Sequence, residues 1–122
     1  AEISAGELID KITILEIKKI KITDKDKLIE IHKELLSLNL ILEKNISDLS
    51  KIEKFRNDLK NINLKLWDIE NGKRECEKNN DFKEKFISLA RNVYKFNDER
   101  AKVKIAINKF LGSNIKEVKS YF

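Results

Sequence analysis

Apolar residues recur every three or four positions along most of the chain, which is the spacing of one face of an α-helix. Four stretches carry this pattern, and their first apolar residues are Leu8, Leu28, Leu49 and Phe82. The first stretch is rich in Ile, which also suits a strand, but it lacks the alternation of a half-buried strand. The pattern therefore predicts an all-α protein with about four helices.

Local residue types mark where the first two helices begin. Ser4-Ala5-Gly6-Glu7 has the spacing of a capping box, in which a Ser and a Glu three positions later bond to free N–H groups at a helix start. The first helix is therefore predicted to begin near Ala5. Thr23–Lys27 is a short polar turn in which Thr23 or Asp24 is the expected N-cap of the second helix.

The third and fourth helices are predicted to be the longest. The third follows Ser47 or Asp48 and extends as far as Glu77, with Asn71-Gly72 as a point of interruption. The fourth covers residues 82–111, between a second capping box at Asp81–Glu84 and the expected C-cap Gly112. Each would span about 45 Å at a rise of 1.5 Å per residue.

Short connections predict that consecutive helices are antiparallel. Residues 1–122 are therefore expected to form a single helical domain, an antiparallel bundle with a short C-terminal tail over 113–122. The two long helices expose apolar surface that the shorter helices cannot cover. We expect a second copy of the chain to cover it in a homodimer, and a monomer covered by its own tail is the alternative.

Composition adds three constraints. The absence of Pro and the presence of only three Gly favour long uninterrupted helices. The net charge of +5 comes from 26 basic and 21 acidic residues that are interleaved, a pattern that does not favour a nucleic-acid partner. The single Cys76 excludes an internal disulfide, and no apolar run approaches the roughly 20 residues of a membrane span. We expect a soluble cytoplasmic protein without a membrane partner.

Polar side chains interrupt the apolar face of the fourth predicted helix. Asn97, Arg100, Lys104 and Asn108 fall among Phe82, Phe86, Leu89, Val93, Phe96, Ile107 and Leu111 at 100° per residue. An isolated buried charge is costly, so an inward Arg and Lys need partners or a ligand. The interior of the bundle is therefore the predicted place of a functional site.

The other three helices also carry polar residues on their apolar faces. These residues are Glu16 on the first helix, His32 and Asn39 on the second, and Asn63 and Glu70 on the third. His32, the only histidine, is expected to be buried and hydrogen-bonded. Acidic and basic members come from different helices, and this distribution predicts ion pairs between helices.

Two interpretations of this set stay open. In the first, Glu16 and Glu70 pair with Arg100 and Lys104, and the buried network determines the register of the helices. In the second, a polar cavity binds a small anionic ligand, with Arg100 and Lys104 on its carboxylate or phosphate oxygens and Asn97 and Asn63 orienting them. The candidate ligand-binding residues are Arg100, Lys104, Asn97, Asn63, Glu70 and Glu16.

A second group of candidates lies outside this set. Arg91, Tyr94 and Asp98 share a face of the fourth helix opposite its apolar stripe, where they either contact another chain or are simply solvated. Trp67 lies at the edge of the third helix's apolar stripe, and Asp68 is a candidate through its acidic pair with Glu70.

Acidic pairs raise the question of a metal. Glu7 and Asp10, with Asp68 and Glu70, are similar to the Mg²⁺-binding acidic motifs of all-α nucleotide pyrophosphohydrolases. The pairs are incomplete and Glu7 already has a capping role, so no metal or cofactor is expected. No nucleophile–base arrangement and no Gly-rich phosphate loop occurs, so no catalytic residue is predicted.

Three strings of residues resemble a known family when taken together. They are residues 4–18, residues 66–70 and residues 86–94, the last continuing through 97–101 and Lys104. They resemble a small uncharacterised all-helical domain family of bacteria and phages over nearly the whole chain. The resemblance implies no activity, cofactor or catalytic residue.

A looser similarity is to the all-helical chorismate mutases, dimeric bundles that hold a dicarboxylate with Arg, Lys and Glu or Gln side chains. Arg100, Lys104, Glu16 and Asn97 supply matching residue types. The first predicted helix lacks the Arg of that family's pattern, so this similarity concerns the fold and does not imply the activity.

Overall fold

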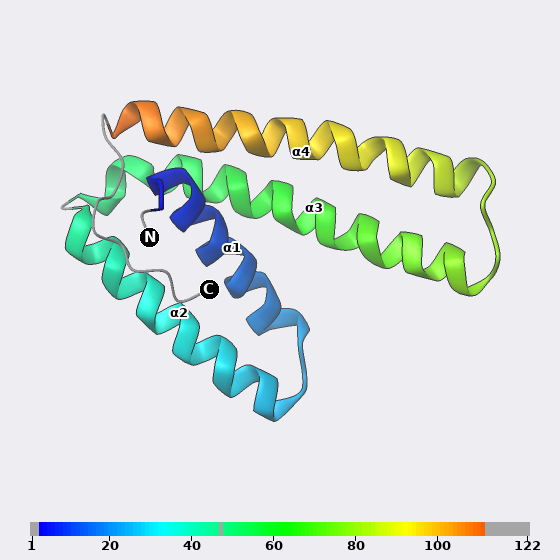
Figure 1. Ribbon diagram of the computed structural model, residues 1–122, viewed down its shortest axis with the longest axis horizontal. Helices are drawn as coiled ribbons and strands as arrows, with labels where there is room; N and C mark the ends of the chain where they lie inside the picture. The colour runs from blue at the N-terminus through cyan, green and yellow to red at the C-terminus, as the bar shows by residue number, and fades with distance from the viewer. Residues whose placement is uncertain (1–2, 47, 112–122) are drawn as a thin grey trace.

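The computed structural model describes residues 3–46 and 48–111 (Figure 1). Within these residues the chain forms four α-helices, α1 (Ala5–Lys21), α2 (Lys25–Asn45), α3 (Glu53–Lys78) and α4 (Glu84–Phe110), and a short 3₁₀ helix, η1 (Leu49–Ile52), that leads into α3. The all-α prediction and the greater length of the last two helices are confirmed. No helix in the described ranges combines the length and the apolar character that crossing a membrane requires.

The helices form two antiparallel hairpins of unequal length (Figure 1). The 26 residues of α3 and the 27 residues of α4 make a pair about 40 Å long. The shorter hairpin of α1 and α2 is inclined to this pair and meets it at one end. Helix α1 packs against all three of the others. The half of the α3–α4 pair that contains the turn between Lys78 and Glu84 is here called the distal hairpin. It projects beyond α1 and α2.

The predicted caps of the first two helices are present. The Ser4 Oγ accepts a hydrogen bond of 3.2 Å from the Glu7 N–H, and α1 begins at Ala5. The Asp24 Oδ1 accepts hydrogen bonds from the N–H groups of Asp26 and Lys27, so Asp24 caps α2. Each cap satisfies backbone donors that have no partner inside the helix.

The start of α3 differs from the prediction. Asp48 accepts a hydrogen bond from the Ser50 N–H and caps η1, and the α-helix itself begins only at Glu53. The hydrogen bond from the Ser50 hydroxyl, together with the one from the Ser50 N–H, holds the pKa of the Asp48 carboxyl below its usual range. Helix α3 continues through Asn71-Gly72 without interruption, contrary to the prediction.

The start of α4 also differs. The Asp81 Oδ1 accepts from the N–H of Lys83 instead of capping a helix at Phe82, and α4 begins at Glu84. The turn before it contains Asn80 at a positive φ of 54°, a conformation that Asn tolerates. The predicted C-cap Gly112 and the tail over 113–122 lie outside the described residues.

The main hydrophobic core lies where the two hairpins meet. Its fully buried members include Leu8, Ile9 and Ile12 of α1, Leu38 and Leu42 of α2, Leu59 of α3 and Ile107 of α4. Ile69 and Cys76 of α3 are also buried, but they lie further along the α3–α4 pair and outside this core. The molecule therefore has a four-helix end and a two-helix end.

Candidate functional site

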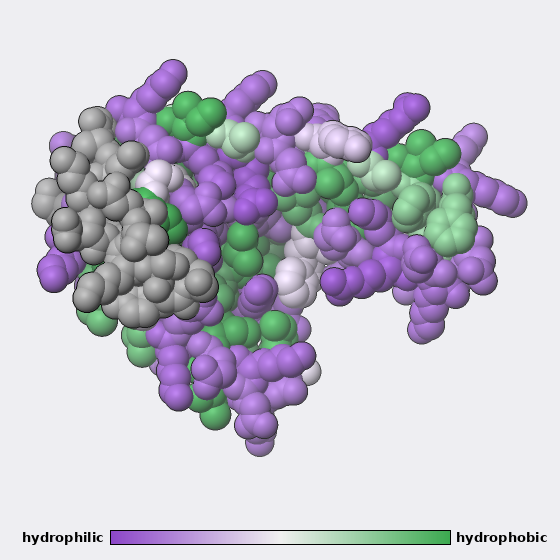
Figure 2. All heavy atoms as spheres, viewed as in Figure 1, coloured by the Kyte–Doolittle hydropathy of each residue, from purple (hydrophilic) through white to green (hydrophobic). Residues whose placement is uncertain are grey.

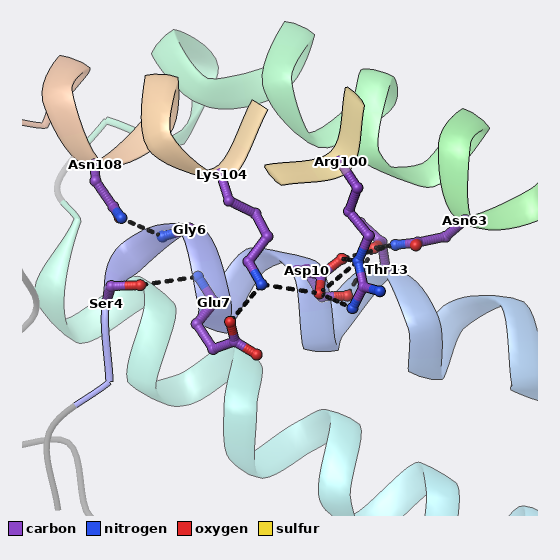
Figure 3. Close-up of polar contacts among 9 residues, drawn as sticks. All are labelled: Ser4, Gly6, Glu7, Asp10, Thr13, Asn63, Arg100, Lys104 and Asn108. Carbon is purple, nitrogen blue, oxygen red and sulfur yellow. Dashed lines mark hydrogen bonds and ion pairs between the residues drawn. The ribbon is translucent and has the colours of Figure 1, made fainter. Parts of the chain in front are cut away.

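A carboxylate at the junction of three helices is completely buried. Asp10 of α1 has no exposed surface, and its Oδ1 and Oδ2 accept hydrogen bonds of 2.9 and 3.1 Å from the Arg100 Nε. The Arg100 Nη2 bonds to Asp10 Oδ2 as well, so the guanidinium of α4 grips the carboxylate with one edge (Figure 3). Such two-pronged charged pairs are the stronger kind of protein hydrogen bond.

Helix α3 reaches the same carboxylate through an amide. The Asn63 Nδ2 donates to Asp10 Oδ1 and to the Thr13 Oγ1, both at 2.9 Å. The Thr13 hydroxyl in turn donates to the Asp10 backbone carbonyl at 2.7 Å. Both oxygens of the carboxylate therefore accept hydrogen bonds, and Thr13 holds the amide of Asn63 in place, as a satisfied buried network requires.

A second ion pair lies one turn nearer the start of α1. The Lys104 Nζ contacts the Glu7 Oε2 and stands 3.8 Å from Asp10 Oδ2. Figure 3 shows Lys104 and Arg100 both extending from α4 toward α1. Glu7, Asp10, Arg100 and Lys104 thus form a cluster without net charge. This cluster, with Asn63 and Thr13 included, is here called the Asp10 network.

The backbones of α1 and α4 touch beside this cluster. A side chain at Gly6 would collide with the backbone carbonyl of Lys104, so only glycine allows the approach. The Gly6 N–H donates to the Asn108 Oδ1 at 2.8 Å, which satisfies a free donor in the first turn of α1. Asn108, predicted to point inward, therefore caps α1 from α4.

The electrostatics of the cluster keep the Arg100 side chain protonated. The hydrogen bonds that Arg100 donates to the Asp10 carboxylate raise the pKa of Arg100 above its already high ordinary value, and burial opposes them only in part. A base with a raised pKa loses its stabilising interaction only when the pH rises through that raised value. Arg100 is therefore a permanent cation at neutral pH.

The predicted acidic partners of Arg100 and Lys104 are wrong. Glu16 pairs with Arg56 of α3 at 3.2 Å. Glu70 pairs with Lys73 on its own helix at 3.6 Å. Glu16 lies further along α1 than Gly6, Glu7 and Asp10, the residues through which α1 contacts α4. The ion pairs between helices exist as predicted, but Glu7 and Asp10 supply the carboxylates.

The predicted burial of Asn97 and His32 is wrong, and that of Asn39 holds only in part. Asn97 is exposed although it lies seven residues from Lys104 on the same flank of α4, because α1 has turned away from α4 at that level. His32 is exposed on α2 and not buried as predicted. Asn39 is half-buried and Asp68 is exposed.

An open cavity of about 250 Å³ lies beside the Asp10 network, between α1 and α3. Asn63 and Arg100 form part of its wall, so the network borders it directly. Trp67 and Glu70, both predicted candidates, also line it. The remaining lining residues are Ile14, Ile17, Leu66, Asn71 and Arg74.

The second predicted face of α4 is a solvent-facing surface. Arg91, Tyr94 and Asp98 are all exposed, and Tyr94 retains 76% of its surface. Ile87 and Ile105 share this face and are 48% and 54% exposed. The stripe runs along α4 opposite the side that packs on α3, so no described element covers it.

The most important residue of the network, Asp10, was interpreted from sequence only as part of an incomplete metal motif. A signal was present, since Gly6, Asp10 and Thr13 follow one another at helical spacing as a ridge of small and polar residues. Such a ridge indicates a close helix crossing. The described residues contain no group of three His, Cys, Asp or Glu side chains that could hold a metal ion.

The chain was compared with known proteins. A family model described as "Family of unknown function (DUF6165)" matches residues 1–122, the whole sequence. No curated protein and no solved structure matches the chain. The chain belongs to this family of unknown function, DUF6165.

Proposed function

We propose that the protein is a helical interaction protein that forms a homodimer through the outer face of α4. In this proposal the Asp10 network is structural and keeps α1, α3 and α4 in register. The observation that carries the proposal is the exposed stripe on α4, which has the spacing of a coiled-coil seam.

The stripe alternates steps of four and three residues. Its members are Ile87, Arg91, Tyr94, Asp98, Ala101 and Ile105. A seven-residue repeat of this kind keeps one line of side chains facing a partner helix. Three of the six, Ile87, Tyr94 and Ile105, are large apolar residues that are 48% exposed or more, which a folded chain rarely arranges in a line without a contact.

The stripe is complementary to itself when two copies run antiparallel. With the two-fold axis at the level of Phe96, Ile87 faces Ile105 of the partner subunit, Tyr94 faces Asp98 of the partner subunit, and Arg91 faces Ala101 of the partner subunit. Arg91 then lies about 4.5 Å along the axis from the level of the partner's Asp98, which is within reach of its side chain. A two-fold axis forms each of these contacts twice.

The structural role of the network is supported by its completeness. Arg100 and Lys104 already contact the carboxylates of Asp10 and Glu7, and Asn97 lies in solvent. A ligand held by Arg100 and Lys104 would have to displace both acids, one of them fully buried. The interpretation in which these two cations bind an anion is therefore disfavoured.

We also propose a cytoplasmic location. The only cysteine, Cys76, is buried and unpaired, which suits a reducing compartment.

The dimer is tested by charge reversal across the proposed two-fold axis. We expect the wild-type chain to be dimeric by light scattering at high micromolar concentration. Arg91→Asp places an acid within reach of Asp98 of the partner subunit. The repulsion between these acids should raise the dimer dissociation constant about tenfold or more. The double variant Arg91→Asp, Asp98→Arg restores opposite charges and should recover the dimer.

The matched control is Lys33→Asp on α2, an exposed position that carries the same change of charge. It should leave the dimer unchanged. A monodisperse monomer at high micromolar concentration, or equal dimer stability in all four proteins, would contradict the proposal.

A further inference from the structure

The cavity between α1 and α3 follows a single face of α3. Asn63, Leu66, Trp67, Glu70, Asn71 and Arg74 recur at steps of three and four residues and all line it. This face is uncovered because α1 diverges from α3 beyond their crossing, and Figure 2 shows the molecule hollowed between the two hairpins. The cavity is therefore a consequence of the angle between the hairpins.

Two guanidinium groups in this cavity have unused donors. Arg74 makes no ion pair or hydrogen bond with any residue in the described ranges. Arg100 bonds to Asp10 through Nε and Nη2, which leaves the two N–H groups of Nη1 without a partner among those residues. A guanidinium with a free pair of N–H groups is suited to a carboxylate or phosphate.

The acid in the cavity does not cancel this charge. Glu70 is bound by Lys73 at 3.6 Å, and Arg100 is balanced by Asp10. The unbalanced charge that remains in the wall is the positive charge of Arg74. The cavity therefore favours an anion, and Arg74 is the residue expected to bind it.

Four of the lining residues are large and apolar. Ile14 and Ile17 of α1 face Leu66 and Trp67 of α3 across the cavity. The volume of about 250 Å³ exceeds the roughly 150 Å³ that holds a benzene ring in an apolar protein cavity. An indole ring is a good surface for stacking another aromatic ring.

We propose that this cavity binds a small aromatic carboxylate, with its ring between Trp67 and the Ile14–Ile17 wall and its carboxylate on Arg74 and the free edge of Arg100. The site is separate from the outer face of α4, so this proposal does not rest on the proposed dimer. Binding here leaves the Asp10 network intact, because it uses only the Nη1 group of Arg100 that the network leaves unbonded.

Trp67 makes the test direct, because it is the only tryptophan of the sequence. Its fluorescence is measured while benzoate is added, in parallel with benzamide, which has the ring without the charge, and acetate and inorganic phosphate, which have the charge without the ring. We expect a saturable change with benzoate below about 10 mM, as suits a ligand of this size, and much weaker changes with the other three compounds. Arg74→Gln should raise the dissociation constant of benzoate about tenfold or more.

The matched control is Arg91→Gln, the same substitution on the outer face of α4. It should leave benzoate binding unchanged even if it weakens the dimer. No saturable response to benzoate, an equal response to any of the other three compounds, or equal benzoate binding by wild-type and Arg74→Gln protein would overturn the proposal. Failure of the dimer alone would leave this site unaffected, since every lining residue comes from one chain.

Discussion

At the scale of single residues, the buried carboxylate of Asp10 connects the three helices that meet around it. It accepts hydrogen bonds from Arg100 of α4 and Asn63 of α3, while Thr13 of its own helix supports Asn63. Residue types and periodicity were enough to predict that Arg100 and Asn63 point inward. They could not predict the acid that Arg100 meets, because a helical repeat gives the face of a residue and not its height against a neighbouring helix.

The stability of the fold should depend on this carboxylate. Asp10→Asn keeps the shape but removes the charge that Arg100 needs, so the free energy of unfolding should fall by about 2–3 kcal/mol in urea denaturation. The value lies at the low end for a buried pair because the Arg100 side chain is 28% exposed. Glu30→Gln, which breaks a fully solvated pair with Lys33, should change it by less than about 0.5 kcal/mol.

A double variant separates the charge from the shape. Asp10→Leu with Arg100→Met replaces the pair by apolar side chains and should recover most of the stability lost in Asp10→Asn. A decrease below about 1 kcal/mol in Asp10→Asn would show that the pair does not hold the helices together.

At the scale of helices, the crossing of α1 and α4 determines which predicted side chains are buried. Asn97 and Lys104 lie on the same flank of α4, yet only Lys104 reaches an acid, because α1 crosses at the level of Lys104 and has left α4 before Asn97. Helix starts were predictable at Ser4 and Asp24, where a side chain bonds to local N–H groups. The crossing was not, since it depends on contacts between residues distant in sequence.

Two glycines allow this crossing to be tested. Gly6→Ala inserts a methyl group against the Lys104 carbonyl, and separating the helices should lower the free energy of unfolding by about 2–3 kcal/mol. Gly72→Ala brings its Cβ to 3.1 Å from a Leu89 methyl, which can rotate away. The gain in helix propensity of about 1 kcal/mol should then leave that variant at least as stable as the wild type in urea denaturation. Equal effects of the two substitutions would contradict a backbone contact at Gly6.

At the scale of the whole molecule, the four-helix end and the distal hairpin should differ in stability. The main core holds residues of all four helices, whereas the distal hairpin is one helix packed on another. Segments with few packed neighbours open locally at low free energy. The predicted lengths of the third and fourth helices had already indicated that these two would extend beyond the first two.

Cys76 reports on this opening, because it is the only cysteine and is 2% exposed near the end of α3. Its thiol should react with a disulfide reagent through local opening of the distal hairpin. The labelling rate in the native state should therefore be nearly the same in wild-type protein and in Asp10→Asn. A rate that rises about a hundredfold in Asp10→Asn, in step with its loss of stability, would show instead that the molecule opens as one unit.

The separation of Asp10 from its partner along the chain has a consequence for folding. Asp10 and Arg100 are 90 positions apart in the sequence, so the acid lies on the first described helix and its counter-charge on the fourth. The α3–α4 hairpin can form through contacts near in sequence, whereas burying α1 earlier would leave a carboxylate in an apolar core without a cation. We therefore expect docking of α1 on the completed α3–α4 hairpin to be the late and slow step of folding. Helix α1 would then be the last of the three helices around Asp10 to pack.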